Sequence, residues 1–285
     1  MSQNLMIQLS ENMPRFSKGQ RRIAQYILDH YETVAFMTAL KLGDAAEVSE
    51  STVVRFAAEL GYEGYPQLQK AMQEMVRSKL TALQRIEVTR ARMSDAQAAE
   101  AVMSCDMANI RKTLEELSRD GFLRAVDAFV NARKVYIFGA GSCRSLAGFA
   151  AYYLKLLLPD THLIYTSSVA EILEEMIHIG EKDVLLALSF PRYSSKAAKA
   201  VHFAHSRQAQ VVAITDSALS PIAPYATELL LAHSDMATLV DSLVAPLSIL
   251  NALIVTISLR VADSRRPALE ALETLWATYD VYEKQ

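Results

Sequence analysis

Five short apolar runs alternate with helix-like stretches after residue 133, and this alternation constrains the fold more than any other feature. The runs are Val135–Phe138, His162–Tyr165, Val184–Leu188, Gln210–Ile214 and Glu228–Leu231. Strands that alternate with helices form βαβ units with right-handed crossovers, and helices then cover both faces of a parallel sheet. The sequence therefore predicts an α/β C-terminal domain, a five-stranded parallel flavodoxin-like three-layer sandwich.

The first part of the chain carries helix patterns only. Ser17 precedes an amphipathic run, further runs cover Thr38–Glu47 and Glu50–Leu60, and Pro66 opens another after Gly61. We expect an all-α N-terminal domain followed by a helical connector. The predicted segments are 1–80 for the helical domain, 81–117 for the connector, 118–262 for the sheet domain and 263–285 for a helical tail.

Composition excludes several classes of protein. A hydrophobic fraction of 51% is too high for a chain disordered throughout, and two cysteines are too few for a disulfide scaffold. A net charge of −3 excludes a globally basic nucleic-acid binder. The first residues include Glu11 and lack a basic leader with an apolar run, so we expect no signal peptide and a cytoplasmic protein.

One uncharged stretch, Ser242–Leu259, is long enough for a membrane span. Its leucines and isoleucines recur at spacings of three and four, which favours a buried or subunit-contacting helix instead. The segment Asp263–Pro267 is predicted to break this helix before a short amphipathic tail, Leu269–Tyr279.

The sharpest local signal lies in residues 42–56, where a tight turn near Glu47 joins two helical patterns. Ser49 stands where an N-cap belongs, while Val53 and Phe56 share the inward face with Leu60. Hydroxyls and a long cation on the outer face suit a helix that reads DNA. The candidate DNA-binding residues are Lys18, Arg21, Arg22, Ser49, Glu50, Ser51, Thr52 and Arg55.

A plain surface helix is the alternative, because basic and acidic residues are equal in number within residues 1–80. DNA binding then requires the cations to gather on one side. Glu47 also occupies a turn position where glycine usually supplies the positive φ.

The motif Val48-Ser49-x-x-Thr52-Val53-x-Arg55-Phe56, followed by Leu60-Gly-Tyr-x-Gly-Tyr-Pro66, resembles the N-terminal domain of RpiR/MurR-type bacterial transcription regulators. That resemblance implies binding to duplex operator DNA.

Two hydroxyl-rich loops follow the first and third predicted strands, where the flavodoxin-like strand order reverses and ligands bind. They are Gly139–Ser145 and Ser189–Ser195, and each opens a helix whose N-terminus favours an anion. Ser142 is a predicted helix cap. Serines that merely cap helices are the alternative interpretation. The candidate effector-binding residues are Gly139, Gly141, Ser142, Ser145, Ser189, Arg192 and Ser194.

Residues 118–262 also resemble the SIS (sugar isomerase) fold, and the resemblance implies that Ser142, Ser145, Ser189 and Ser194 contact the phosphate of a phosphosugar. The second loop departs from the family pattern: Pro191 replaces a serine, Arg192 a glycine and Lys196 an acid. A sugar isomerase needs a general base, so the missing acid argues against enzyme activity.

Other polar residues are weaker candidates. His202 and His205 lie one helical turn apart but have no third ligand nearby, so we expect packing rather than a metal site. Cys143 near a helix N-terminus is a possible redox thiol, with a plain loop residue as the default. No metal or cofactor is expected.

The sequence thus predicts a transcription regulator whose operator affinity changes when a phosphorylated sugar or sugar acid binds. We expect a homodimer or homotetramer outside any membrane. A phosphosugar isomerase with a fused helical domain is the alternative, and an inactive oligomeric scaffold is a third.

Overall fold

The computed structural model describes residues 2–79, 81–235 and 239–283, and it divides the chain into two compact units, Met1–Ala91 and Arg92–Gln285. The helical N-terminal domain, which we call the head, and the five-stranded sheet therefore fall in separate units, as the sequence predicts. The finer division of the chain stays a prediction, and its boundary at residue 80 lies outside the described residues.

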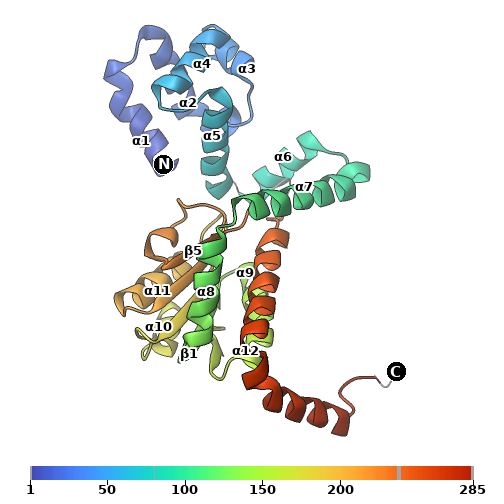
Figure 1. Cartoon of the computed structure of the whole chain (residues 1–285). Helices are drawn as coiled ribbons and strands as arrows, with labels where there is room; N and C mark the ends of the chain where they lie inside the picture. Colours follow the sequence, from blue (N-terminus) through green and yellow to red (C-terminus); the bar gives the residue numbers. More distant parts are fainter. Residues whose placement is uncertain (1, 80, 236–238, 284–285) are drawn as a thin grey trace. The chain divides into compact units, whose positions relative to one another are not determined.

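The first unit is entirely helical (Figure 1). Its core is formed by the apolar faces of the first five helices. It includes Ile23 and the two predicted inward-facing residues Val53 and Phe56, all fully buried. The elements are α1 (Ser2–Asn12), a 3₁₀ turn (Met13–Arg15), α2 (Lys18–Val34), α3 (Ala39–Ala45), α4 (Glu50–Glu59), α5 (Tyr65–Lys79) and α6 (Ala82–Arg92).

The second unit is a parallel sheet in the order β2-β1-β3-β4-β5, which confirms the flavodoxin-like prediction. The strands are β1 (Lys134–Gly139), β2 (Thr161–Leu163), β3 (Asp183–Leu188), β4 (Gln210–Thr215) and β5 (Glu228–Leu231). The helices are α7 (Asp95–Glu116), α8 (Arg119–Asn131), α9 (Cys143–Leu157), α10 (Val169–Glu175), α11 (Ser195–Ser206) and α12 (Val244–Thr278), with a 3₁₀ turn at Ala223–Tyr225.

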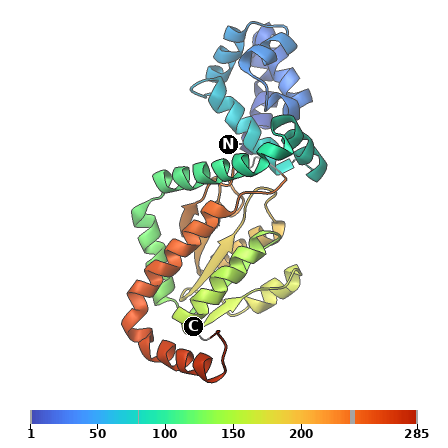
Figure 2. The same ribbon diagram turned by 90° about the vertical axis from the view of Figure 1, so that its right-hand side faces the viewer.

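Alternate side chains of the central strands feed two separate cores, one on each face of the sheet. Ile137 and Leu186 pack beneath α8, α9 and α12, whereas Phe138 and Leu185 pack beneath α10 and α11 (Figure 2). Both faces are therefore covered, which explains why the strands read as continuous apolar runs.

Among the described residues, α12 is the one helix long and apolar enough to cross a membrane. Ile249, Leu253 and Ile257 are buried in the sheet domain, so its first half is a core helix, as the sequence predicts. The predicted break at Pro267 is wrong, because the helix runs on to Thr278. The helix changes direction in its C-terminal part instead (Figures 1 and 2), and a proline that removes one helical hydrogen bond can bend a helix without ending it.

Candidate functional site

The start of α4 carries a cluster of hydroxyl groups. Ser49 caps the helix, because its Oγ accepts a hydrogen bond from the backbone N of Thr52 at 3.3 Å. The same Oγ lies 2.9 Å from Ser51 Oγ and 2.8 Å from Thr52 Oγ1. Unpaired N–H groups and these exposed hydroxyls face solvent at one helix N-terminus, an arrangement that favours phosphate.

The turn between α3 and α4 is fixed by two backbone features. Glu47 has a φ of 54°, which confirms the positive φ that the sequence predicts at this turn. Gly43, which sequence reasoning missed, lets α3 approach the turn: a Cβ there would lie 2.9 Å from the carbonyl oxygen of Val48. A glycine inside a short helix, where it costs stability, was the available signal.

Two of the predicted cations, Arg22 and Arg21, are held by other groups of the protein. Arg22 forms an ion pair of 3.2 Å with Glu47, and Arg21 donates to the backbone oxygens of Phe16 and Pro14. Arg55 is exposed on α4, with its Nε 3.3 Å from the oxygen of Ser51. Lys18 and Glu50 are exposed at the starts of α2 and α4. These two helix starts are neighbours, since a Cβ on Gly19 would lie 3.5 Å from Thr52 Cγ2.

A cavity of about 480 Å³ lies beyond the carboxyl ends of β1 and β3, which are adjacent in the sheet at the point where strand order reverses. The two predicted loops line it together. Of the candidate effector-binding residues, the cavity brings together Gly141, Ser142, Ser189, Arg192 and Ser194.

Gly139 and Ser145 do not line the cavity. Gly139 has a packing role, because a Cβ there would lie 2.5 Å from the carbonyl oxygen of Cys143 and push α9 off β1. Ser145 lies on the exposed side of the first turn of α9.

Ser189 has an unpaired hydroxyl. The residue is 2% exposed, and its buried Oγ has no hydrogen-bond partner among the described residues. A buried polar atom without a partner costs about 1–3 kcal/mol, so such atoms at a cavity wall indicate a missing ligand or water.

Ser194 and Ser142, the other two cavity serines predicted to bind the effector, differ in whether they cap a helix. Ser194 caps α11 by accepting from the backbone N of Lys196 at 3.2 Å. The predicted cap at Ser142 is wrong, because its hydroxyl makes no cap hydrogen bond. Its φ of −62° and ψ of −30° are helical, whereas a capping residue is extended. The exposed Ser142 hydroxyl is thereby left facing the cavity.

The charged residues of the cavity wall are mainly cationic. Arg144, Arg192 and Lys196 line it, and Asp241 is the one carboxylate among its described lining residues. Arg192 has a φ of 65°, a left-handed conformation that favours glycine. Backbone strain of this kind persists at binding sites when the surrounding structure enforces it.

Burial raises the pKa of the Cys143 thiol to about 11. The redox hypothesis requires a lowered pKa at the helix N-terminus, and the raised pKa argues against it, because a protonated thiol is unreactive near neutral pH. His202 and His205 both pack edge-on against the ring of Tyr225, with centroids 5.1 and 5.5 Å away.

Sequence reasoning missed Thr166, Ser167 and Asp241. Thr166 and Ser167 follow β2 and have the same signal as the predicted loops, namely hydroxyls after a strand end. Asp241 comes from the segment between β5 and α12, where no local pattern marks it.

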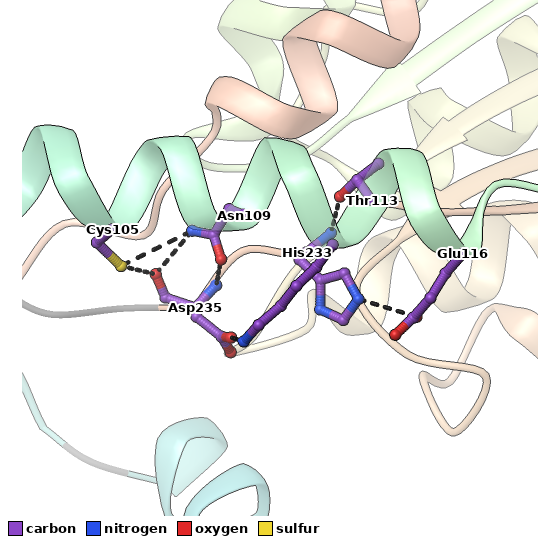
Figure 3. Close-up of polar contacts among 7 residues, drawn as sticks. Cys105, Asn109, Thr113, Glu116, His233 and Asp235 are labelled. Atoms are coloured by element: carbon purple, nitrogen blue, oxygen red, sulfur yellow. Dashed lines mark hydrogen bonds and ion pairs between the residues drawn. The ribbon is translucent and has the colours of Figure 1, made fainter.

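Helix α7 forms hydrogen bonds to the segment between β5 and α12 (Figure 3), and we call this set of contacts the clasp. Asn109, 1% exposed, bonds both backbone groups of Asp235: its Nδ2 donates to the oxygen at 3.1 Å, and its Oδ1 accepts from the nitrogen at 3.2 Å. Thr113 Oγ1 accepts from the backbone N of His233 at 2.8 Å, and Ser242 Oγ donates to Asp106 at 2.6 Å. The segment that carries Asp241 into the cavity is therefore fastened to α7.

The two units match two known families. Residues 3–79 match the helix-turn-helix domain of the rpiR family, and residues 128–256 match the SIS domain. The chain is 26% identical over 282 residues to the HTH-type transcriptional regulator HexR of Pseudomonas aeruginosa, which covers 95% of this chain and 94% of that protein.

Two solved structures are similar in fold. The sugar isomerase domain of an RpiR transcription factor from Sphaerobacter thermophilus aligns with a TM-score of 0.59 at 23% identity, over 62% of this chain and 99% of that one. The NanR protein of Vibrio vulnificus, complexed with ManNAc-6P, aligns with a TM-score of 0.58 at 22% identity, over 95% of this chain and 98% of that one.

Proposed function

Because the chain belongs to the rpiR family of helix-turn-helix transcriptional regulators with a SIS domain, we propose that it is a regulator switched by a small anion. A phosphorylated sugar or sugar acid binds the cavity beyond β1 and β3. Binding changes the affinity of the helical head for operator DNA. The protein acts in the cytoplasm, where both partners are found.

The buried, unpaired Ser189 hydroxyl is the observation that supports effector binding most directly. The hydroxyls of Ser142 and Ser194 stand on the same cavity wall at the starts of α9 and α11. Two helix N-termini and these hydroxyls suit a phosphate group. Lys196 and Arg192 add charge that suits a second anionic group, and the NanR complex with ManNAc-6P shows a phosphosugar on a protein of the same fold.

A thermal-shift screen with phosphorylated sugars and sugar acids tests effector binding. A true effector at a hundredfold excess over its dissociation constant stabilises the protein by about 2.7 kcal/mol. Ser189→Ala removes the unpaired hydroxyl, so we expect equal or greater stability without effector and a smaller shift with it. A ligand that stabilises wild type and Ser189→Ala equally would bind elsewhere.

On the DNA side, the exposed face of α4 from Ser49 to Arg55 is the proposed reading surface. Arg55→Ala should weaken binding to a specific operator by about 1–3 kcal/mol if the guanidinium contacts a base edge. Glu59→Ala, at another exposed position of α4, is the matched control. Gel shifts with genomic fragments identify the operator. If Arg55→Ala binds that operator with unchanged affinity, Arg55 does not contact a base.

The isomerase alternative retains one supporting feature, the Asp241 carboxylate in the cavity. A carboxylate beside a bound sugar also accepts hydrogen bonds from its hydroxyl groups, which needs no catalysis. A coupled turnover assay on aldose and ketose phosphates separates the two roles.

A further inference from the structure

One cation of the cavity wall rests on an aromatic ring. The guanidinium carbon of Arg144, on the first turn of α9, lies 5.0 Å from the centroid of the Tyr165 ring, which is within the range of a cation–π contact. Arg144 lines the cavity, and its guanidinium forms no ion pair or hydrogen bond with another described residue. An arginine on a ring face can still donate its N–H groups, because these lie in the guanidinium plane.

The segment that presents this ring is fixed on both sides of it. Ile164, directly before Tyr165, is 1% exposed, and its backbone N donates to β1 at 3.0 Å. Thr166, directly after Tyr165, donates from its Oγ1 to the Glu171 carboxylate and accepts a backbone hydrogen bond at 3.1 Å. Tyr165 itself is 64% exposed and buries little surface, so its ring is held in place for Arg144 by its neighbours.

The strand order places this pair to one side of the proposed phosphate position. β1 lies between β2 and β3, so the loops after β2 and β3 flank the loop after β1 from opposite sides. The cavity serines that suit a phosphate follow β1 and β3, whereas Tyr165 follows β2, and the next two residues also line the cavity. Neighbouring strands are about 4.8 Å apart. An effector whose phosphate lies between the starts of α9 and α11 therefore reaches the β2 side with its other end.

We propose that Arg144 binds the end of the effector distant from its phosphate, and that Tyr165 is the positioning residue that holds Arg144 there. This inference rests on the proposed effector site. The guanidinium donates to oxygen atoms at that end, which belong to hydroxyl or carboxylate groups. The ring restricts the long side chain before the effector arrives, so less conformational entropy is lost on binding.

Calorimetry with two probes separates the two ends of the effector. Inorganic phosphate tests the cavity serines alone, and the sugar phosphate with the largest shift in the thermal-shift screen tests the whole site. Arg144→Ala should weaken binding of the sugar phosphate by about tenfold or more, and Tyr165→Leu by about three- to tenfold. Both variants should bind inorganic phosphate as wild type does. Ser189→Ala should weaken binding of both probes.

A positioning role also predicts a rescue and a coupling. Tyr165→Phe should bind the sugar phosphate like wild type, because the ring face and not the hydroxyl contacts Arg144. In the Arg144→Ala background, Tyr165→Leu should cause no further loss. Tyr279→Leu makes the same change at a 75% exposed tyrosine after α12 and should leave both affinities unchanged.

Three results would overturn this assignment and leave the effector site in place. They are a Tyr165→Phe variant as weak as Tyr165→Leu, additive losses for Arg144→Ala and Tyr165→Leu, and equal losses for the two probes. Wild type that binds no sugar phosphate more tightly than inorganic phosphate would also overturn it. Wild type that binds neither probe would overturn the proposed function itself.

Discussion

Of the four non-glycine residues with a positive φ among the described residues, Glu47 and Arg192 each lie at a candidate binding site. Glu47 closes the turn before the DNA-reading helix and pairs with Arg22. Arg192 places a cation on the wall of the effector cavity. At both positions a side chain is kept in spite of backbone strain, which indicates that the side chain contributes something glycine lacks.

Arg192 can be tested with two substitutions that separate strain from charge. Arg192→Gly removes both, whereas Arg192→Ala removes only the charge. We expect both variants to bind a phosphorylated sugar acid more weakly by calorimetry. Only Arg192→Gly should gain free energy of unfolding, by about 1 kcal/mol in urea. Equal affinity of wild type and Arg192→Ala for an acidic ligand would remove Arg192 from the site.

The Cys143 thiol gives a pH dependence with a definite sign. Burial raises its pKa from the ordinary 9.0 to about 11 in the folded protein, so the unfolded chain ionises first as pH rises. The stability linked to this thiol is complete below pH 9 and is lost toward pH 11, by about 2 kcal/mol. Unfolding in urea at pH 8 and pH 10.5 should show a smaller loss for Cys143→Ala than for wild type. Equal losses in the two proteins would show that the thiol is not held neutral.

Among the elements, α3 and α4 depend on Gly43 for their close approach. Gly43→Ala puts a Cβ 2.9 Å from a backbone oxygen, so the turn must shift and the head should lose about 1–3 kcal/mol with a matching loss of operator affinity. Gly19→Ala is the control, because its Cβ meets only ordinary contacts at 3.5 Å. Thermal unfolding distinguishes them, and an unperturbed Gly43→Ala would contradict the packing described for this turn.

The clasp between α7 and the segment after β5 can be opened at Asn109. Asn109→Ala leaves buried backbone groups of Asp235 short of partners and should cost about 1–3 kcal/mol. It should also reduce the effect of the sugar ligand on operator affinity, because the clasped segment carries Asp241 into the cavity. Lys112→Ala removes only a partly exposed ion pair to Asp235 and should change stability by less than about 0.5 kcal/mol. Matching effects of the two variants would argue against the clasp.

Sequence reasoning succeeded for elements whose signals are local. The strands, the Ser49 cap and the paired loops follow from short runs, and right-handed crossovers then fix the strand order. It failed at Pro267, an exposed residue through which α12 continues although proline normally ends a helix, and at Asp241, which reaches the cavity from a segment distant in sequence. The close approach that Gly139 permits is to the backbone of Cys143, four residues along the chain, and the loop pattern alone assigned this glycine to the ligand instead.

In the whole molecule, one small cavity is proposed to control a separate DNA-binding head. Thermodynamic linkage makes that control reciprocal: if the effector changes operator affinity by some factor, operator DNA changes effector affinity by the same factor. The clasp fastens the segment that carries Asp241 to α7, the first helix that follows the head in the sequence.

The most direct measurement is a pair of titrations with the ligand selected by the thermal-shift screen. Fluorescence anisotropy gives operator affinity with and without saturating ligand, and calorimetry gives ligand affinity with and without operator. The account predicts one shared factor, about 5–150-fold. Ser189→Ala should need a higher ligand concentration to reach the same change in operator affinity, because it binds the ligand more weakly. A ligand that binds the cavity yet leaves operator affinity unchanged would contradict it.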